Sequence, residues 1–222
     1  MAEPAQLSTH SVIDPAILYW GTPVVLITSS NEDGTSNIAP MSSAFWIGNS
    51  CMLGLSAKSK TTHNILRTRN CVLNLPDHSP EMVAAVNALA RTTGTEIVPP
   101  TKRARGYVFV QDKWVRAGLD PLKSDLVPPQ RIAQCPVQME CELIGTHAMF
   151  GNDAAHVGAC LALEVTVLSV HVRDELRMDG FADRIDPDRW RPMIMSFQQL
   201  YGLRDGKLAE SVLGRIDEEL YR

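Results

Sequence analysis

The sequence lacks several features that would assign it to a specialised class of protein. No apolar run approaches the length of a membrane-spanning helix, and residues 1–14 have neither the basic start nor the apolar centre of a secretory signal. The net charge is only −4, and no face rich in Lys and Arg offsets it. We therefore expect a cytoplasmic protein with no membrane and no nucleic acid among its partners.

One short run of basic residues needs an interpretation. The densest run is Thr101-Lys102-Arg103-Ala104-Arg105. Three cations within four residues are more typical of a solvated loop than of a binding patch, so we predict a loop there.

The five cysteines form no C-x-x-C pair and no metal-ligand rhythm. Within the segment CPVQMECEL, alternation places Cys135, Val137, Met139 and Cys141 on one strand face. This pattern is typical of a buried face, so we expect reduced core thiols and no metal site.

The length and composition of the chain fit one globular domain over residues 1–222. Hydrophobic residues make up 45% of the chain and charged residues 21%, which is ordinary for such a domain. Residues 1–18 resemble an N-terminal arm. In residues 207–220, apolar residues recur at helical spacing and predict a C-terminal helix; they are Leu208, Val212, Leu213, Ile216 and Leu220.

Strand-like segments dominate the remainder, and tight turns such as Asp33-Gly34 connect several of them. The expected strands span residues 24–28, 37–40, 43–48, 51–55, 71–75, 107–110, 137–147 and 161–172. Further helices are expected at residues 61–69, from Ser79-Pro80, and from Ile185. The pattern predicts a mainly β fold, a closed or partly open antiparallel β-barrel with peripheral helices.

Residues 19–76 contain the most informative motif. Here a sheet delivers a loop rich in Ser, Lys and Thr onto the start of a short helix, which is a natural anion cradle. The alternative is an ordinary surface helix in which Ser59 or Thr61 is the N-cap and nothing is bound.

Several segments, in this order, resemble the flavin reductase-like family of flavoredoxin-like proteins. The core of the resemblance spans residues 19–201. The matching pieces are Gly21-Thr22-Pro23-Val24, Asp33-Gly34, Asn37-Ile38-Ala39-Pro40-Met41-Ser42, Thr61-Thr62-His63-Asn64-Ile65, Val72-Leu73-Asn74-Leu75-Pro76, Lys113-Trp114, Ala117-Gly118-Leu119, Arg131-Ile132, Cys135-Pro136-Val137-Gln138-Met139-Glu140-Cys141, Glu164-Val165 and Arg184-Ile185-Asp186. The family fold is an FMN-binding split barrel of Greek-key antiparallel strands, and this fold is implied here.

The resemblance implies an NAD(P)H:flavin oxidoreductase. FMN is the implied cofactor, with FAD as the alternative, and NADH or NADPH is the co-substrate. The flavin carries hydride through N5 to free flavin or another acceptor. Two other functions stay open: a non-enzymatic FMN-binding electron-transfer protein, and a flavoenzyme acting on a specific apolar metabolite. The resemblance also implies a homodimer with flavin at its interface, and a monooxygenase is a further candidate partner.

The same resemblance assigns binding residues. The flavin ring and ribityl chain are expected against Ala39, Pro40, Met41, Ser42, Ser43 and Ala44. The phosphate is expected at Ser56, Lys58, Ser59 and Thr61, with Asn64 in support. No acid–base pair is required and none is visible, so the catalytic residues stay unassigned; the histidines that could lie near the flavin are His147, His156 and His171. Each could equally be structural.

Residues 192–201 depart from the family pattern, because they are bulky and apolar where many relatives are rich in Gly and Arg. This predicts either an apolar surface bordering the open face of the flavin or a helix packed on the barrel or on a second subunit.

Overall fold

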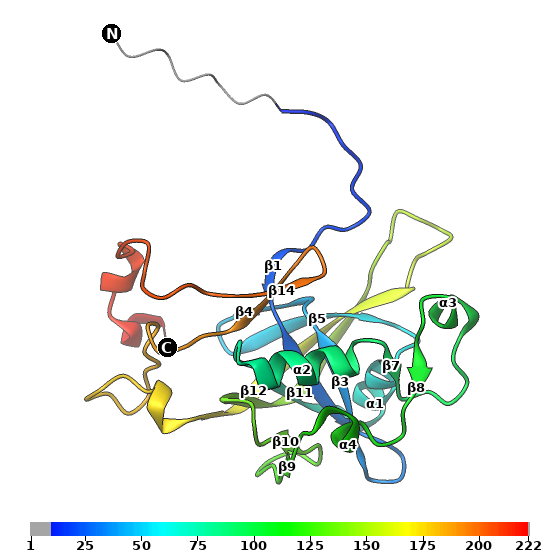
Figure 1. The fold of residues 1–222 in the computed structure, drawn as a ribbon, viewed down its shortest axis with the longest axis horizontal. Coiled ribbons are helices and arrows are strands. Elements are labelled where there is room, and N and C mark those ends of the chain that lie inside the picture. The colour runs from blue at the N-terminus through cyan, green and yellow to red at the C-terminus, as the bar shows by residue number, and fades with distance from the viewer. Residues whose placement is uncertain (1–9, 222) are drawn as a thin grey trace.

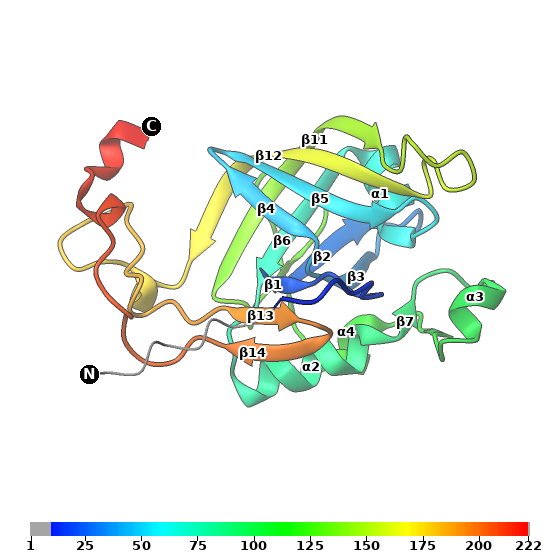
Figure 2. The same ribbon diagram turned by 90° about the horizontal axis from the view of Figure 1, so that it is seen from above.

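The computed structural model describes residues 10–221. Its main element is a seven-stranded antiparallel sheet (Figures 1 and 2). The strand order is β3 (Ser36–Met41), β2 (Val25–Ser30), β6 (Asn70–Leu75), β11 (Val137–Ala148), β12 (Cys160–Val172), β5 (Ser50–Ser56) and β4 (Ala44–Ile47). The strands predicted within residues 24–75, 137–147 and 161–172 are therefore confirmed as strands, and only their ends differ by a few residues.

The two edge strands of this sheet, β3 and β4, are separated in the chain by Ser42 and Ser43 alone. The sheet must therefore curl until its two edges approach each other at these serines. Within residues 10–221 no ladder joins β3 to β4, so the barrel is not closed. The prediction of a mainly β, barrel-like fold is confirmed in part, as a curved open sheet.

Smaller elements surround the sheet. A three-stranded sheet contains β1 (Trp20–Pro23), β13 (Met193–Ser196) and β14 (Gln199–Gly202). The helices are α1 (Lys60–Thr68), α2 (Pro80–Ala90), α3 (Pro100–Arg103) and α4 (Lys113–Ala117), and the short strands are β7 (Thr92–Thr93), β8 (Val108–Phe109), β9 (Pro121–Leu122) and β10 (Arg131–Ile132). Of the helices in the described part of the chain, none has the length and apolar composition needed to cross a membrane.

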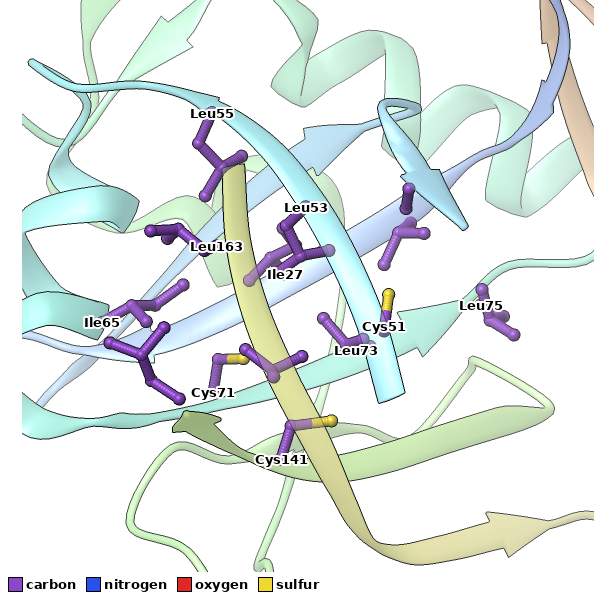
Figure 3. Packing of buried hydrophobic residues seen from close by; sticks show 14 of the residues in the cluster. Ile27, Cys51, Leu53, Leu55, Ile65, Cys71, Leu73, Leu75, Cys141 and Leu163 are labelled. Atoms are coloured by element: carbon purple, nitrogen blue, oxygen red, sulfur yellow. The ribbon is translucent and has the colours of Figure 1, made fainter. Parts of the chain in front are cut away.

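Strand β2 is buried on both faces and separates two hydrophobic clusters. Val25 and Ile27 belong to the cluster inside the curved sheet, which Figure 3 shows from close by. Val24 and Leu26 belong to the other cluster, which α2 and Met193 of β13 cover from outside. The continuous apolar run of β2 thus reflects burial on two sides.

All five cysteines are free thiols. The predicted sharing of one face is wrong for Cys135, which precedes β11 and packs in the outer cluster, whereas Cys141 packs in the inner one. Burial raises the pKa of Cys51 to about 12, and it also raises the pKa of Cys135, so both stay protonated at neutral pH.

Helix α2 begins as the sequence predicts. Ser79 is its N-cap and accepts a hydrogen bond from the backbone N–H of Met82, and Pro80 is the first helical residue. The helix ends at Ala90, and the chain then turns into β7.

Two predicted helices are absent, and the helix given as one alternative for residues 192–201 is also wrong, because β13 and β14 form a hairpin there. Residues 207–220 contain only two 3-10 helices, η2 (Leu213–Arg215) and η3 (Glu218–Tyr221), and the apolar side chains of this segment are exposed. Without a surface to pack on, an amphipathic segment gains too little to stay helical. The segment after Ile185 forms turns, in which the Asp186 carboxylate accepts the backbone N–H of Asp188.

Candidate functional site

The start of α1 is the structural centre of the candidate site. Ser59 is the N-cap, and its Oγ accepts the backbone N–H of Thr62 at 3.0 Å. The Thr62 hydroxyl donates to the Ser56 carbonyl oxygen at 2.8 Å, so the Ser59 hydroxyl must donate to Thr62 Oγ1, also at 2.8 Å. The Ser59 side chain is therefore committed to the cap, while the N–H groups of Lys60 and Thr61 have no intrahelical acceptor.

Thr61 is oriented by Asn37, which lies on β3. The Asn37 side-chain amide donates to Thr61 Oγ1 at 3.1 Å, and both side chains are buried. Because this bond occupies a lone pair of the threonine oxygen, the Thr61 hydroxyl hydrogen can be donated to a ligand.

A pocket of about 250 Å³ lies beside this helix start. Five segments meet around it: the end of β3, the end of β5, the start of α1, the chain after α2, and Lys113 of α4. Its charged lining residues are Lys60, Lys102, Arg105 and Lys113. Within the described part of the chain, this lining contains no aspartate or glutamate, so the pocket favours an anion.

Lys113 is the least expected of these cations, because it is only 4% exposed. Its Nζ donates to the Ile38 carbonyl oxygen at 2.8 Å, and no other hydrogen bond from this ammonium is found within residues 10–221. Burial, with a smaller contribution from Lys102, lowers the pKa of Lys113 to about 8. The site thus holds a desolvated cation with spare donors.

Lys102 and Arg105 both lie 5.7 Å from the ring of Tyr107, which also lines the pocket. Burial, followed by the charge of Arg105, lowers the pKa of Lys102. The predicted loop is in part a short helix, because Lys102 lies in α3 and is half-buried, whereas Arg105 is exposed as predicted; both residues line the pocket. The α3 segment folds back toward α1, about forty positions earlier in the chain, and no local pattern signals that approach.

The structure brings six of the predicted binding residues together. These line the pocket: Ala39, Pro40, Met41, Ser56, Ser59 and Thr61. Lys58, which was expected at the phosphate, is exposed and lies outside the lining, whereas Lys60 lies within it. Successive side chains of a helix point about 100° apart. An error of one or two residues in the predicted helix start therefore changes which lysine is expected to face the pocket.

Four other predicted binding residues take part in the packing and hydrogen bonding of the fold. Ser42 is buried, Ser43 Oγ lies 3.2 Å from Tyr19 Oη, and Ala44 packs in the inner cluster. Asn64 is fully buried and donates to Ser29 Oγ at 3.2 Å and to Asn31 Oδ1 at 2.9 Å. None of these four residues lines the pocket.

The three candidate histidines lie outside the pocket lining. His147 is exposed on β11, and His156 Nδ1 lies 2.6 Å from Asp153 Oδ2 in the loop before β12. His171 Nε2 lies 2.8 Å from Glu140 Oε1. None of them is a lining residue.

A possible metal site is formed by Asp125, Glu140 and His171. One potential ligand atom from each of these side chains lies within 4.8 Å of the other two. Glu140 is fully buried, and its carboxylate accepts the backbone N–H groups of Asp125 at 2.9 Å, Leu126 at 2.6 Å and Val127 at 3.1 Å. With His171 as a fourth partner, this carboxylate anchors a loop and has little capacity left for a metal ion.

Sequence reasoning missed Asn37, Lys60 and Lys113 as site residues. A signal existed for two of them, because Asn37 and Lys113 both lie in segments that resemble the family. Their contribution to the site depends on side-chain direction, which the sequence does not show.

Comparisons with known proteins show which sequences this chain resembles. The sequence model described as "Flavin reductase like domain" matches residues 19–196. The chain is 35% identical over 191 residues to the uncharacterized protein YdfE of Bacillus subtilis (strain 168), which covers 86% of this chain and 88% of YdfE.

Two solved structures share the fold at low sequence identity. Flavoredoxin of Desulfovibrio vulgaris (Miyazaki F) is 17% identical with a TM-score of 0.71, covering 94% of this chain and 99% of that one. Nitrilotriacetate monooxygenase component B from Bacillus cereus is 20% identical with a TM-score of 0.69, covering 92% and 100%. On the match of the family model over residues 19–196, this chain belongs to the flavin reductase-like family.

Proposed function

We propose that this protein binds FMN and acts as an NAD(P)H:flavin oxidoreductase. The observation that carries the proposal is the cationic pocket without carboxylates at the start of α1. A flavin phosphate is an anion that suits such a pocket, and membership of the flavin reductase-like family supports a flavin as the ligand.

The phosphate is held by donors that the protein fold does not use. These are the N–H groups of Lys60 and Thr61, the Thr61 hydroxyl oriented by Asn37, and the N–H donors of the Lys113 ammonium that its bond to Ile38 leaves over. The Ser59 side chain contributes indirectly, because it keeps the helix start in place. Charge-assisted hydrogen bonds of this kind are roughly twice as strong as neutral ones.

The end of β3 borders the rest of the ligand. Ala39, Pro40 and Met41 line the pocket, and small residues there let a flat ring approach the backbone. When bound, the flavin supplies the hydride chemistry through its N5 atom. The protein needs no acid–base pair for this step, so its residues bind and orient the cofactor.

A homodimer is part of the proposal. Large apolar side chains are exposed on β1, β4 and the β13–β14 hairpin, which neighbour one another in Figures 1 and 2. Trp20 is 70% exposed and Ile47 is 76% exposed, and the Trp20 ring meets Phe197 edge-on at 4.7 Å. Such a surface is typical of a protein interface. A monooxygenase that accepts reduced flavin is a second partner, suggested by the structural likeness to a monooxygenase component.

Two measurements test the proposal. Titration should show that FMN binds at least tenfold more tightly than riboflavin, because riboflavin lacks the phosphate; equal affinities would exclude the phosphate site. Anaerobic mixing of the holoprotein with NADH and with NADPH should bleach the flavin absorbance. If neither nicotinamide reduces the bound flavin, the reductase function fails and an electron-transfer protein becomes the better description.

A further inference from the structure

Lys113, the first residue of α4, has surroundings that favour an uncharged amine. Its side chain is 4% exposed, and the one hydrogen bond found for it within residues 10–221 runs from Nζ to the Ile38 carbonyl oxygen at 2.8 Å. The carboxylate of Asp112, its neighbour in the chain, accepts the backbone N–H of Val115 at 3.0 Å and does not line the pocket. Within the described part of the chain, no carboxylate in the pocket lining therefore compensates for the desolvation of an ammonium at this position.

The other cations of the pocket act in the same direction. Lys60, Lys102 and Arg105 share the lining with Lys113. Burial, and to a smaller extent the charge of Lys102, lowers the pKa of Lys113 to about 8. At pH 8 roughly half of the Lys113 side chains are then uncharged, against less than about 1% for a lysine of ordinary pKa. A lysine that is desolvated and lies beside another cation is an activated nucleophile.

The hydrogen bond to Ile38 leaves the reactive part of this amine free. An uncharged amine has two N–H donors and one lone pair, and the carbonyl oxygen uses only a donor. The lone pair is therefore available to an electrophile in the pocket that Lys113 lines. The same pocket of about 250 Å³ contains the start of α1, where the Thr61 hydroxyl and free backbone N–H groups suit a phosphate. An electrophile that carries a phosphate is thus brought next to the amine.

We propose that Lys113 is a modification site that takes an acyl group from an acyl phosphate. The phosphate of the reagent binds at the start of α1, and the uncharged Nζ attacks the carbonyl carbon. A C–N bond forms, and the bond between the carbonyl carbon and the bridging oxygen breaks. The phosphate leaves with the electron pair of that bond and takes up the proton that Nζ loses, so no oxidant, reductant or further reactant is needed.

Acylation of Lys113 weakens the binding of FMN. The product is an amide, so the side chain loses its charge, and the acyl group occupies part of the pocket. FMN in turn protects Lys113, because its phosphate takes the place of the reagent. These two consequences rest on the proposed function, whereas the acylation itself needs only the anion pocket.

The test treats the full-length, ligand-free protein with acetyl phosphate at pH 8 and follows each lysine by mass spectrometry of its peptides. Lys113 should be acetylated roughly tenfold or more faster than Lys58 and Lys123, which are exposed and lie outside the pocket lining. Inorganic phosphate and FMN should each suppress the labelling of Lys113 alone. Acetic anhydride, an acetyl donor without a phosphate, is the control reagent, and inorganic phosphate should not change its labelling pattern.

Two variants connect the labelling to the pocket. Thr61→Val removes a phosphate donor and keeps the amine, so it should slow the acetylation of Lys113 by acetyl phosphate but not by acetic anhydride. Lys113→Arg keeps a cation that acetyl phosphate does not acylate. Treatment should therefore raise the Kd for FMN roughly tenfold or more in the wild type and leave the Kd of Lys113→Arg at its value before treatment.

Three results would overturn the inference: labelling of Lys113 no faster than that of Lys58, labelling that inorganic phosphate does not suppress, or preferential labelling of Lys102. If the untreated wild type does not bind FMN, the proposed function fails, but acetylation of Lys113 that inorganic phosphate suppresses would still support the modification site. If Lys113→Arg does not fold, the labelling pattern of the wild type decides alone.

Discussion

At the residue scale, the hydrogen bond between Asn37 and Thr61 prepares one hydroxyl for the ligand. We predict that Thr61→Val raises the Kd for FMN about tenfold to a hundredfold, since a hydrogen bond to a charged group contributes about 1.5–3 kcal/mol. Riboflavin affinity should not change, because it lacks the phosphate. The measurement is fluorescence titration with both ligands.

Lys58 and Lys60 provide a matched pair for the same site. Lys58 is exposed and outside the pocket lining, whereas Lys60 lines the pocket. Lys58→Ala should leave the Kd for FMN unchanged. Lys60→Ala should raise it only a few-fold, because the backbone N–H of residue 60 remains while a side-chain charge beside the pocket, shared with Glu32, is lost. The opposite result would restore the sequence-based assignment of Lys58 to the phosphate.

Lys113 makes the site sensitive to pH. Its pKa is about 8 in the folded protein against an ordinary value of 10.5, so between these values the unfolded chain binds more protons than the folded one. Stability of the ligand-free protein should therefore rise with pH across this window. FMN affinity should fall above pH 8, because the ammonium loses its charge.

Lys113→Met should abolish both effects and stabilise the ligand-free protein at pH 7. Urea unfolding and FMN titration at pH 7.0 and 9.5 provide the measurement. Lys123→Met, which changes an exposed lysine, is the control. A pH profile of FMN affinity that is the same in Lys113→Met and in the wild type would contradict the role of Lys113.

At the element scale, Glu140 of β11 fixes the loop that contains residues 125–127. Burial raises the pKa of Glu140, but the hydrogen bonds from this loop and from His171 outweigh it and lower the pKa below the ordinary value of 4.5. This carboxylate therefore stabilises the fold above about pH 4.5, and its contribution is lost as the pH falls through the lowered pKa.

Glu140→Gln places an amide donor against backbone N–H groups, and we predict a loss of about 3 kcal/mol in the free energy of unfolding at pH 7. The difference from the wild type should shrink under acid conditions. Glu142→Gln, at an exposed position on the same strand, should have little effect. Urea unfolding at pH 7 and pH 4 gives the answer; equal losses at both would contradict the charged role of Glu140.

Elements with a strong local signal could be predicted from the sequence. The run of β2 and the Ser79-Pro80 start of α2 depend on neighbouring residues, and both were placed correctly. The 207–220 segment has helical spacing too, but a helix also needs a surface to cover, and this requirement is not local. The same limit applies to the site, where only the tertiary fold brings Lys102 to the pocket at the start of α1.

At the scale of the whole molecule, the exposed aromatic surface on β1 and β4 predicts self-association. Trp20→Asp and Phe45→Asp each place a charge on this surface, so either change should convert a dimer into a monomer in sedimentation velocity. Val115→Asp is the control, because it also replaces an exposed apolar side chain by a charge, but on α4. It should leave the dimer intact. A wild type that is monomeric at micromolar concentration, or a dimer that survives both changes, would rule out this surface as the interface. If the flavin lies at the interface, the monomeric variants should also bind FMN more weakly than Val115→Asp does.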